Sequence, residues 1–337
     1  MLQGEEAIEG ELGDEGAGGV HPEDAASLLH GTILPSPATS PARPDRAGNL
    51  PRTPKETPMI DLHCHSTCSD GSESPASLVR LAAGAGLSAL ALTDHDGLSG
   101  LREAEEAACS AGIELVPGCE VSCAFSPGSL HILCYFVEEG DGPLQSQLER
   151  LRADRASRNE RLVARLNELG IEITLEEVAA EAGGDTLGRP HFAAALVRKG
   201  VSGSYQAAFD DLLGKGGPAY IPKAFVSAEE TLAAAAGSRA LTVLAHPLSL
   251  SLAPPALESF VISLREAGLT GMECLYGRYA PEERAGLVRI AERNGLVATG
   301  GSDYHGSFKP DLAVGVGRGD LEVPDSVLSA LKERRTA

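Results

Sequence analysis

The sequence predicts an α/β fold built on a mainly parallel sheet, either open or closed into a barrel. From residue 59 onward, short apolar runs typical of strands alternate with segments of helical periodicity. Such alternation is the pattern of βαβ units, in which each helix crosses back over the sheet. Several predicted strands also end in histidine or a carboxylate, and functional groups gather at the carboxyl ends of barrel strands.

The size and charge of the chain limit the kinds of function it can have. Its 337 residues suffice for one large α/β domain with an insertion or for two ordinary domains. Lysine and arginine total 28 against 48 aspartates and glutamates, a net charge of -20, so the surface as a whole repels polyanions. Any nucleic-acid substrate must therefore be held locally, and recognition of a DNA sequence is not expected.

The cysteines and the apolar runs predict a soluble cytoplasmic protein. The seven cysteines are odd in number and form no CxxC pair, which is typical of reduced, mostly buried thiols. No run approaches the roughly 18 apolar residues of a membrane helix. The acidic start also lacks the basic and apolar regions of a signal peptide.

Three regions differ in composition. Residues 1–58 are Gly/Glu-rich and then Pro-rich, which predicts a disordered acidic and proline-rich tail. Between 143 and 221 the α/β alternation stops and helices dominate, which predicts an inserted helical subdomain. The α/β body is then formed by residues 59–142 and 222–337.

The elements of the body follow one another along the chain. Ser74 and Pro75 are typical of the N-cap and first position of a helix. The expected elements before the insertion are a strand at 60–66, a helix at 74–86, a strand at 87–96, a helix at 101–112, and strands at 113–123 and 131–137. After it come strands at 241–247, 270–276 and 297–305, with helices at 256–268 and 281–295. Within the insertion, helices are expected at 142–170, 174–183, 189–200 and 204–216.

The first predicted strand carries two histidines, His63 and His65, in the stretch MIDLHCHSTCSDG. Positions i and i+2 of a strand point the same way, so both side chains can reach one metal ion. Asp70 follows in the turn just beyond the strand. Taken alone, the motif fits equally well a structural strand that happens to carry two histidines.

The case for a metal site depends on repetition of these residue types. Imidazole and carboxylate ligands suit Zn, Mn or Fe rather than Ca, and one carboxylate can bridge two ions. Further candidate ligands stand at the ends of later predicted strands or open one of them: His95, Glu120, His131, His246, Asp303 and His305.

The motifs DLHCHSTCSDG, LTDHDG, PGCEVS, AHP and GSDYH, in this order, resemble the metal motifs of the PHP (polymerase and histidinol phosphatase) superfamily. The resemblance covers residue 59 to about residue 310. It implies a distorted (β/α)7 barrel and a trinuclear metal centre that hydrolyses phosphoesters with a metal-bridging hydroxide. Gly97 stands where the superfamily more often has threonine, at a position that is not a ligand.

The resemblance also implies how three divalent ions (Mn, Fe or Zn) are held. One ion would be held by His63, His65, Glu120 and Asp303. A second would be held by Glu120, His131 and His246, and the third by Asp70, His95 and His305. Of these residues, Glu120, Asp303 and His305 are expected to be catalytic.

The insertion indicates which branch of the superfamily the sequence resembles. In LGRPHFAAALVRKG, Pro190 opens a helix whose free N–H groups, beside Arg189 and His191, favour an anion. Together with GKGGPAYIPK, this motif resembles the branch that contains the 3′,5′-nucleoside-bisphosphate phosphatase and a 5′→3′ exoribonuclease. A helix-capping role is the alternative for His191. Weaker substrate-binding candidates, equally explicable as a solvated rim, are Lys215, Tyr220 and Lys223.

A row of arginines in RADRASRNERLVAR allows two interpretations. Their spacing by three or four places them along one side of a helix, where they could follow an RNA backbone. The interleaved Asp154 and Glu160 favour a salt-bridged exposed face instead. The row consists of Arg152, Arg155, Arg158, Arg161 and Arg165.

The expected substrate is a phosphorylated nucleotide or a short RNA. Two other functions remain open, histidinol-phosphate phosphatase and a noncatalytic metal-binding PHP module. The GRPH insertion argues against the first, and the full set of candidate ligands argues against the second.

Overall fold

The computed structural model describes residues 59–182 and 186–336, and the predicted tail 1–58 lies outside them. Seven strands form one sheet in chain order, from β1 to β7. Their bounds are β1 (Met59–Asp61), β2 (Leu87–Leu92), β3 (Glu114–Cys123), β4 (Leu130–Tyr135), β5 (Leu241–Leu244), β6 (Gly271–Tyr276) and β7 (Val297–Gly301).

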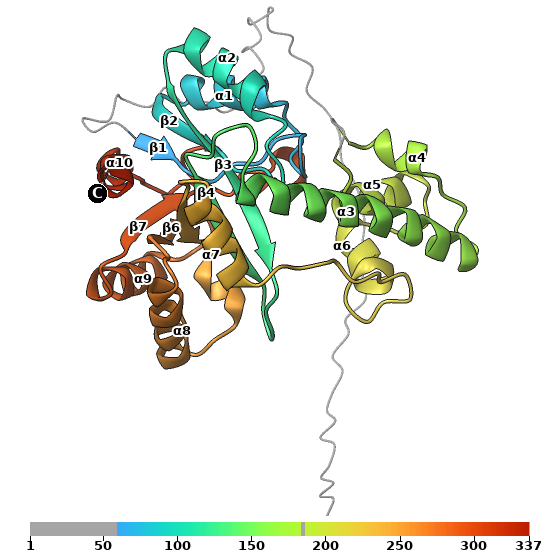
Figure 1. Cartoon of the computed structure of the whole chain (residues 1–337). Helices are drawn as coiled ribbons and strands as arrows, with labels where there is room; N and C mark the ends of the chain where they lie inside the picture. The colour runs from blue at the N-terminus through green and yellow to red at the C-terminus, as the bar shows by residue number, and fades with distance from the viewer. Residues whose placement is uncertain (1–58, 183–185, 337) are drawn as a thin grey trace, which may run out of the picture. The chain divides into compact units, whose positions relative to one another are not determined.

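The sheet curls into a nearly closed barrel (Figure 1). The first and last strands approach each other where the Leu62 N–H donates to the Gly300 carbonyl at 3.2 Å. Six of the strands run in the same direction, whereas β4 runs antiparallel to its neighbours β3 and β5. The predicted distorted seven-stranded α/β barrel is confirmed.

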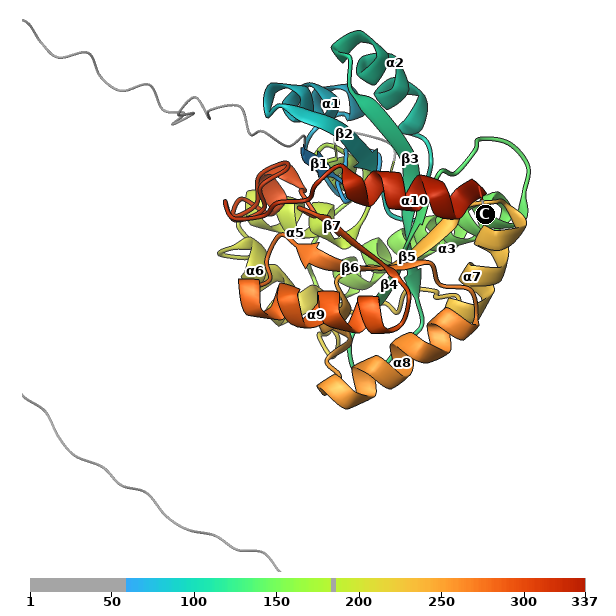
Figure 2. The ribbon, with the colours of Figure 1, turned by 90° about the vertical axis from the view of Figure 1, so that its left-hand side faces the viewer.

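Helices cover the outside of the barrel because each presents an apolar side to the strands. The helices α1 and α2 pack beside β1 and β2, and α7, α8 and α9 cover the strands from β3 to β7. Helix α10 packs Leu328 and Leu331 against Ile60 and Val323 and lies across the barrel in Figure 2. Their bounds are α1 (Pro75–Gly84), α2 (Leu101–Ala111), α7 (Ala228–Gly237), α8 (Pro254–Glu266), α9 (Pro281–Arg293) and α10 (Ser326–Thr336).

A long helix leads from the barrel to a group of short helices (Figure 1). The first part of α3 packs Leu144, Leu148 and Leu151 into the barrel core, and its second part packs Leu162 and Leu166 into a separate core. The helices are α3 (Pro143–Glu168), α4 (Leu175–Ala179), α5 (Arg189–Arg198), α6 (Tyr205–Ala208) and a π-helix at Phe209–Leu213. The expected helices are present, whereas the domain boundary at 143–221 stays a prediction.

Two of the described α-helices were not predicted. In α7 the sequence AEETLAAAAG has too few large apolar residues for a clear period, and a capping box between Ser227 and Glu230 defines its start instead. In α10 only Leu328 and Leu331 are buried, so the apolar stripe is narrow. Among the helices of residues 59–182 and 186–336, none has the length and hydropathy needed to cross a bilayer.

The first strand is shorter than predicted. It ends at Asp61, whose buried carboxylate accepts the N–H groups of His63 (3.2 Å), Ser302 (2.8 Å) and Gly315 (2.7 Å). The regular backbone hydrogen bonds of the sheet therefore end just before the two histidines, and the Asp61 side chain accepts backbone N–H groups there instead.

Candidate functional site

Backbone pairing beyond the strand ends brings the first and last candidate motifs together. The His65 N–H donates to the Tyr304 carbonyl at 3.0 Å, and the Asp303 N–H donates to the His63 carbonyl at 2.8 Å. The approach requires glycine at 301, because a Cβ there would lie 2.4 Å from the Cβ of His63. The HxH pair and the DYH motif thus lie side by side although they are far apart in sequence.

Backbone pairing also brings the motifs between these two, which carry His95, Glu120, His131 and His246, to the same end of the barrel. His95 pairs as an isolated bridge with Glu120, which lies within β3. His131 stands near the start of β4, and because β4 is antiparallel its start lies at the same barrel end as the carboxyl ends of its neighbours. The Ala245 N–H donates to the His131 carbonyl at 3.1 Å, which places His246 beside it.

Glu120 stands at the centre of the cluster, and its two carboxylate oxygens face different histidines. Its Oε1 lies 2.8 Å from His131 Nδ1 and 2.9 Å from His246 Nε2. Its Oε2 faces three other ring nitrogens: His63 Nε2 at 3.4 Å, His65 Nε2 at 3.2 Å and His95 Nδ1 at 3.2 Å. This geometry suits a carboxylate that bridges two ions.

Two aspartates complete the arrangement. The Oδ1 of Asp303 lies 3.4 to 3.5 Å from nitrogens of His63, His65 and His305. The Oδ1 of Asp70 lies 3.3 Å from His305 Nε2. The structure therefore brings all nine predicted metal ligands into one cluster: His63, His65, Asp70, His95, Glu120, His131, His246, Asp303 and His305.

The electrostatics of the cluster favour ionised carboxylates and divide its imidazoles into two groups. Burial opposes ionisation of Asp70, Glu120 and Asp303, but neighbouring histidines and, for Asp303, Lys309 hold the pKa of each carboxyl well below its ordinary value. Burial lowers the pKa of His95 to about 3. For His65, burial is outweighed by the carboxylates of Asp303 and Glu120, which raise its pKa to about 9, and the carboxylates around His63 raise its pKa likewise. A neutral imidazole such as that of His95, next to an anionic carboxylate, is ready to bind a cation, whereas His63 and His65 would release a proton on binding one.

The side chains present fit divalent metal ions. Three groups of donor atoms each lie within 4.8 Å of one another: His65, Asp70, His95 and His305; His63, His65 and Glu120; and His95, Glu120 and His131. Within the described part of the chain, the buried His95 Nδ1 lies 3.2 Å from Glu120 Oε2 but makes no hydrogen bond, as expected of an atom aimed at an ion. The mixture of imidazole nitrogen and carboxylate oxygen suits Zn, Mn or Fe.

Residues outside the nine candidate ligands fix the orientation of the histidine rings. They were not predicted from the sequence. Glu273 of β6 is fully buried and lies 2.9 Å from His63 Nδ1, while its other oxygen accepts the His246 N–H at 2.7 Å. Ser249 Oγ lies 2.9 Å from His246 Nδ1. Such partners fix the ring tautomer and position. A glutamate inside the apolar run GMECLY was the available signal for Glu273.

Three residues at the site have left-handed backbone conformations. The φ angles of Asp96, His246 and Asp303 are 52°, 26° and 54°. Non-glycine residues there are strained, and such strain concentrates at functional sites.

A second cluster, of cations, lies next to the first and is centred on the fully buried Asp96. Asp96 Oδ2 accepts from Arg155 and lies 2.8 Å from Lys223 Nζ, which also donates to Ser122 Oγ at 2.5 Å. Burial opposes ionisation of Asp96, but Lys223 and Arg155 hold its pKa below the ordinary value. Because Ser122 is paired with His131 in the β3–β4 ladder, the two clusters share one end of the barrel.

Two further arginines join this cation cluster. Burial, together with the charges of Arg189 and Arg155, lowers the pKa of Arg158 to about 9. Arg189 donates to the Ile221 carbonyl at 3.0 Å, and its guanidinium lies 4.8 Å from the centre of the Tyr220 ring. We call Arg155, Arg158, Arg189 and Lys223 together the cation cluster.

The favoured interpretation of the arginine row as a salt-bridged exposed face is wrong for two of its members. Arg155 and Arg158 are buried: Arg155 reaches Asp96 at the barrel end, and Arg158 donates to its neighbour Asn159 at 2.9 Å. Arg165 does pair with Glu168 on the surface.

The other predicted substrate contacts lie in different surroundings. His191 is buried, and its Nδ1 accepts the Gly188 N–H at 3.0 Å, so it does cap α5. Its buried Nε2 has no hydrogen-bond partner among the residues described. Lys215 is exposed, and within those residues it has no hydrogen bond or ion pair with either cluster.

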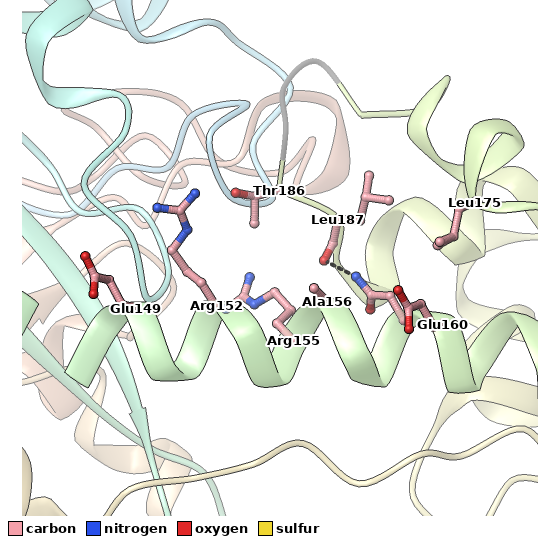
Figure 3. Close-up of a pocket in the computed structure, with 9 residues that line it drawn as sticks. Glu149, Arg152, Arg155, Ala156, Glu160, Leu175, Thr186 and Leu187 are labelled. Atoms are coloured by element: carbon pink, nitrogen blue, oxygen red, sulfur yellow. Dashed lines mark hydrogen bonds between the residues drawn. The ribbon is translucent and has the colours of Figure 1, made fainter. Parts of the chain in front are cut away.

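A pocket of about 350 Å³ opens along α3 (Figure 3). Arg152, Arg155 and Asn159 of α3 face Thr186 and Leu187 across it. Asn159 donates to the Leu187 carbonyl at 2.9 Å. Because Arg155 also contacts Asp96, this side chain links the pocket with the cation cluster.

Comparison with known proteins gives one family and several relatives. The family model described as PHP domain matches residues 61–184. A 3′,5′-nucleoside bisphosphate phosphatase of Chromobacterium violaceum is 31% identical, with 73% of this chain and 87% of the relative covered. A 5′-3′ exoribonuclease of Haemophilus influenzae is 33% identical, with 74% and 90% covered. A phosphoribosyl 1,2-cyclic phosphate 1,2-diphosphodiesterase of Eggerthella lenta is 35% identical, with 74% and 94% covered.

A solved structure supports the same relation. The crystal structure of a putative metal-dependent phosphoesterase from Bifidobacterium adolescentis superposes with a TM-score of 0.73 at 33% identity. The match covers 82% of this chain and 96% of that one.

Proposed function

The chain belongs to the PHP domain family of metal-dependent phosphoesterases, and we propose that it acts on nucleotides that carry a second phosphate. The substrate is a 3′,5′-nucleoside bisphosphate, which loses its 3′-phosphate, or a short RNA that is cut from its 5′ end. The observation that supports this choice is the cation cluster beside the cluster of nine metal-type ligands.

The nine clustered side chains would hold three divalent ions of Mn, Fe or Zn, and Glu120 would be a ligand of two of them. Bound there, the ions would supply Lewis acidity to polarise the phosphoryl group and to activate water. We assign the residues predicted to be catalytic, Glu120, Asp303 and His305, to holding these ions. Glu273 keeps the His63 ring in the orientation in which Nε2 faces Glu120.

The charge balance of the cation cluster favours an anionic ligand. Among the described residues, the ion pairs of these four cations involve one carboxylate, that of Asp96, which pairs with Arg155 and Lys223. Burying like charges without a counter-charge is costly, and a phosphate would offset that cost. In a chain of net charge -20 such a cluster attracts phosphate locally, as the sequence requires.

The second phosphate held in this way sets the position of the scissile ester. A phosphate bound by planar guanidinium groups has a fixed orientation, because each fork can make two parallel hydrogen bonds. The ester to be cleaved then lies at a fixed distance, on the side of the nine-ligand cluster. A monoester without a second phosphate lacks this contact.

The two alternative functions fit the site less well. Histidinol phosphate carries a positively charged amino group, which four neighbouring cations would repel. A noncatalytic metal-binding module would be expected to lack some ligand side chains, whereas all nine are present here.

The test offers several substrates to the same Mn-loaded protein. They are adenosine 3′,5′-bisphosphate, a 5′-phosphorylated oligoribonucleotide, phosphoribosyl 1,2-cyclic phosphate and histidinol phosphate. We expect the highest kcat/KM on the bisphosphate or the oligoribonucleotide. A clear preference for histidinol phosphate or for the cyclic phosphate would contradict the proposal.

A further inference from the structure

Phe225 is the exposed aromatic residue of the described chain. Its side chain is 49% exposed, whereas the other six phenylalanines are buried or half-buried. Burying a ring of this size lowers the free energy. A ligand that covers the ring would therefore bind more tightly.

The position of Phe225 is fixed relative to the cation cluster. The Ala124 N–H at the end of β3 donates to the Val226 carbonyl at 2.7 Å, which attaches this segment to the barrel. Two residues before Phe225, Lys223 places its Nζ 6.0 Å from the centre of the ring. The same Nζ donates to Ser122, so the ring lies at the edge of the site.

This geometry points to a substrate-specificity role, and we propose that Phe225 stacks against the nucleobase of the bound nucleotide. The inference rests on the proposed function and names a contact for the part of the substrate that carries no phosphate. Lys223 and the arginines hold the phosphate, and the adjacent ring offers an apolar face to the base. Every base has a π-face, so the contact favours nucleotides over other phosphoesters without selecting one base.

The absence of tryptophan from the chain gives a direct test of stacking. The Phe225→Trp variant carries a single fluorescent indole, and stacking on a base quenches it. Adenosine 5′-monophosphate, which keeps the base and one phosphate, should quench the metal-loaded variant saturably. Ribose 5-phosphate, which lacks the base, should not. The matched control is Leu81→Trp on α1, where the native side chain is 44% exposed, and it should not respond to either ligand.

A second measurement separates stacking from simple apolar contact. Phe225→Ala should weaken binding of adenosine 5′-monophosphate by roughly 5- to 140-fold, the range expected for one base stacked on an aromatic ring. Phe225→Leu keeps apolar bulk without a π-face and should lose nearly as much. If Phe225→Leu binds like the wild type, or if Phe225→Trp is not quenched, the inference is wrong.

These outcomes are distinguishable from failure of the proposed function. Quenching without hydrolysis of any nucleotide would leave Phe225 as a base-binding residue and reject the function. Hydrolysis of adenosine 3′,5′-bisphosphate with a KM that Phe225→Ala does not change would keep the function and reject the stacking.

Discussion

Asp96→Asn tests the interpretation of the cation cluster most sharply. Asparagine keeps the shape of the side chain, tolerates the left-handed backbone at this position and can still accept the Ser122 N–H. It removes only the negative charge. Arg155 and Lys223 then face each other, with Arg158 nearby, and no buried carboxylate between them.

The size of the effect follows from burial. Asp96 is fully buried, Arg155 is nearly so and the Lys223 side chain is 17% exposed, and removing one partner of a buried ion pair costs about 3–5 kcal/mol. For a folded unit of this size the melting temperature should fall by roughly 5–20 °C. Removing one partner of a solvent-exposed ion pair would instead lower the free energy of unfolding by only about 0–1 kcal/mol.

The protein provides a matched control. Asp311 is also bridged by two cations, Arg278 at 2.7 Å and Arg318 at 3.1 Å, but its side chain is 38% exposed. Calorimetry of both variants in the same metal-containing buffer should show a large loss for Asp96→Asn and almost none for Asp311→Asn. Equal, small shifts would refute the view that Asp96 balances buried positive charge.

Three further predictions follow from the site. Glu273→Gln should lower metal affinity or activity roughly 10- to 100-fold, because the His63 ring loses its carboxylate partner, and isothermal metal titration measures this. Unchanged metal affinity and activity would show that Glu273 does not orient the ring. Arg189→Ala should lower kcat/KM on adenosine 3′,5′-bisphosphate by roughly ten- to a hundredfold while hydrolysis of p-nitrophenyl phosphate changes much less. Equal losses on both substrates would assign Arg189 to the fold. Chelation should lower the melting temperature, since ions present at 100 times their Kd stabilise by about 2.7 kcal/mol. A melting curve that is the same with and without chelator would contradict a preformed metal centre.

Most of the nine candidate ligands could be found in the sequence because they stand at the ends of predicted strands. His63 and His65 share one side of an extended segment, and Asp303 and His305 repeat that spacing at the end of the last strand. Alternating strands and helices predict that such strand ends meet at one end of a barrel. The clustering therefore follows from short-range patterns and one rule of topology.

The rest of the site depends on contacts between distant residues. Glu273 is 210 positions from the histidine it contacts, and its strand shows only an isolated glutamate among apolar residues. Arg155 resembles any solvated arginine of a charged helix until α3 is placed across the barrel end, beside Asp96. The antiparallel direction of β4, which places His131 at the site, is likewise not signalled by its own residues.

The most direct test of the metal-dependent mechanism is phosphate release from adenosine 3′,5′-bisphosphate by the metal-stripped protein before and after divalent metal is added back. We expect no release from the stripped protein and recovery with Mn²⁺, and we expect the His63→Ala and Asp303→Ala variants to stay inactive while remaining folded. Full activity in the stripped protein, or in either variant, would contradict catalysis by the clustered ligands.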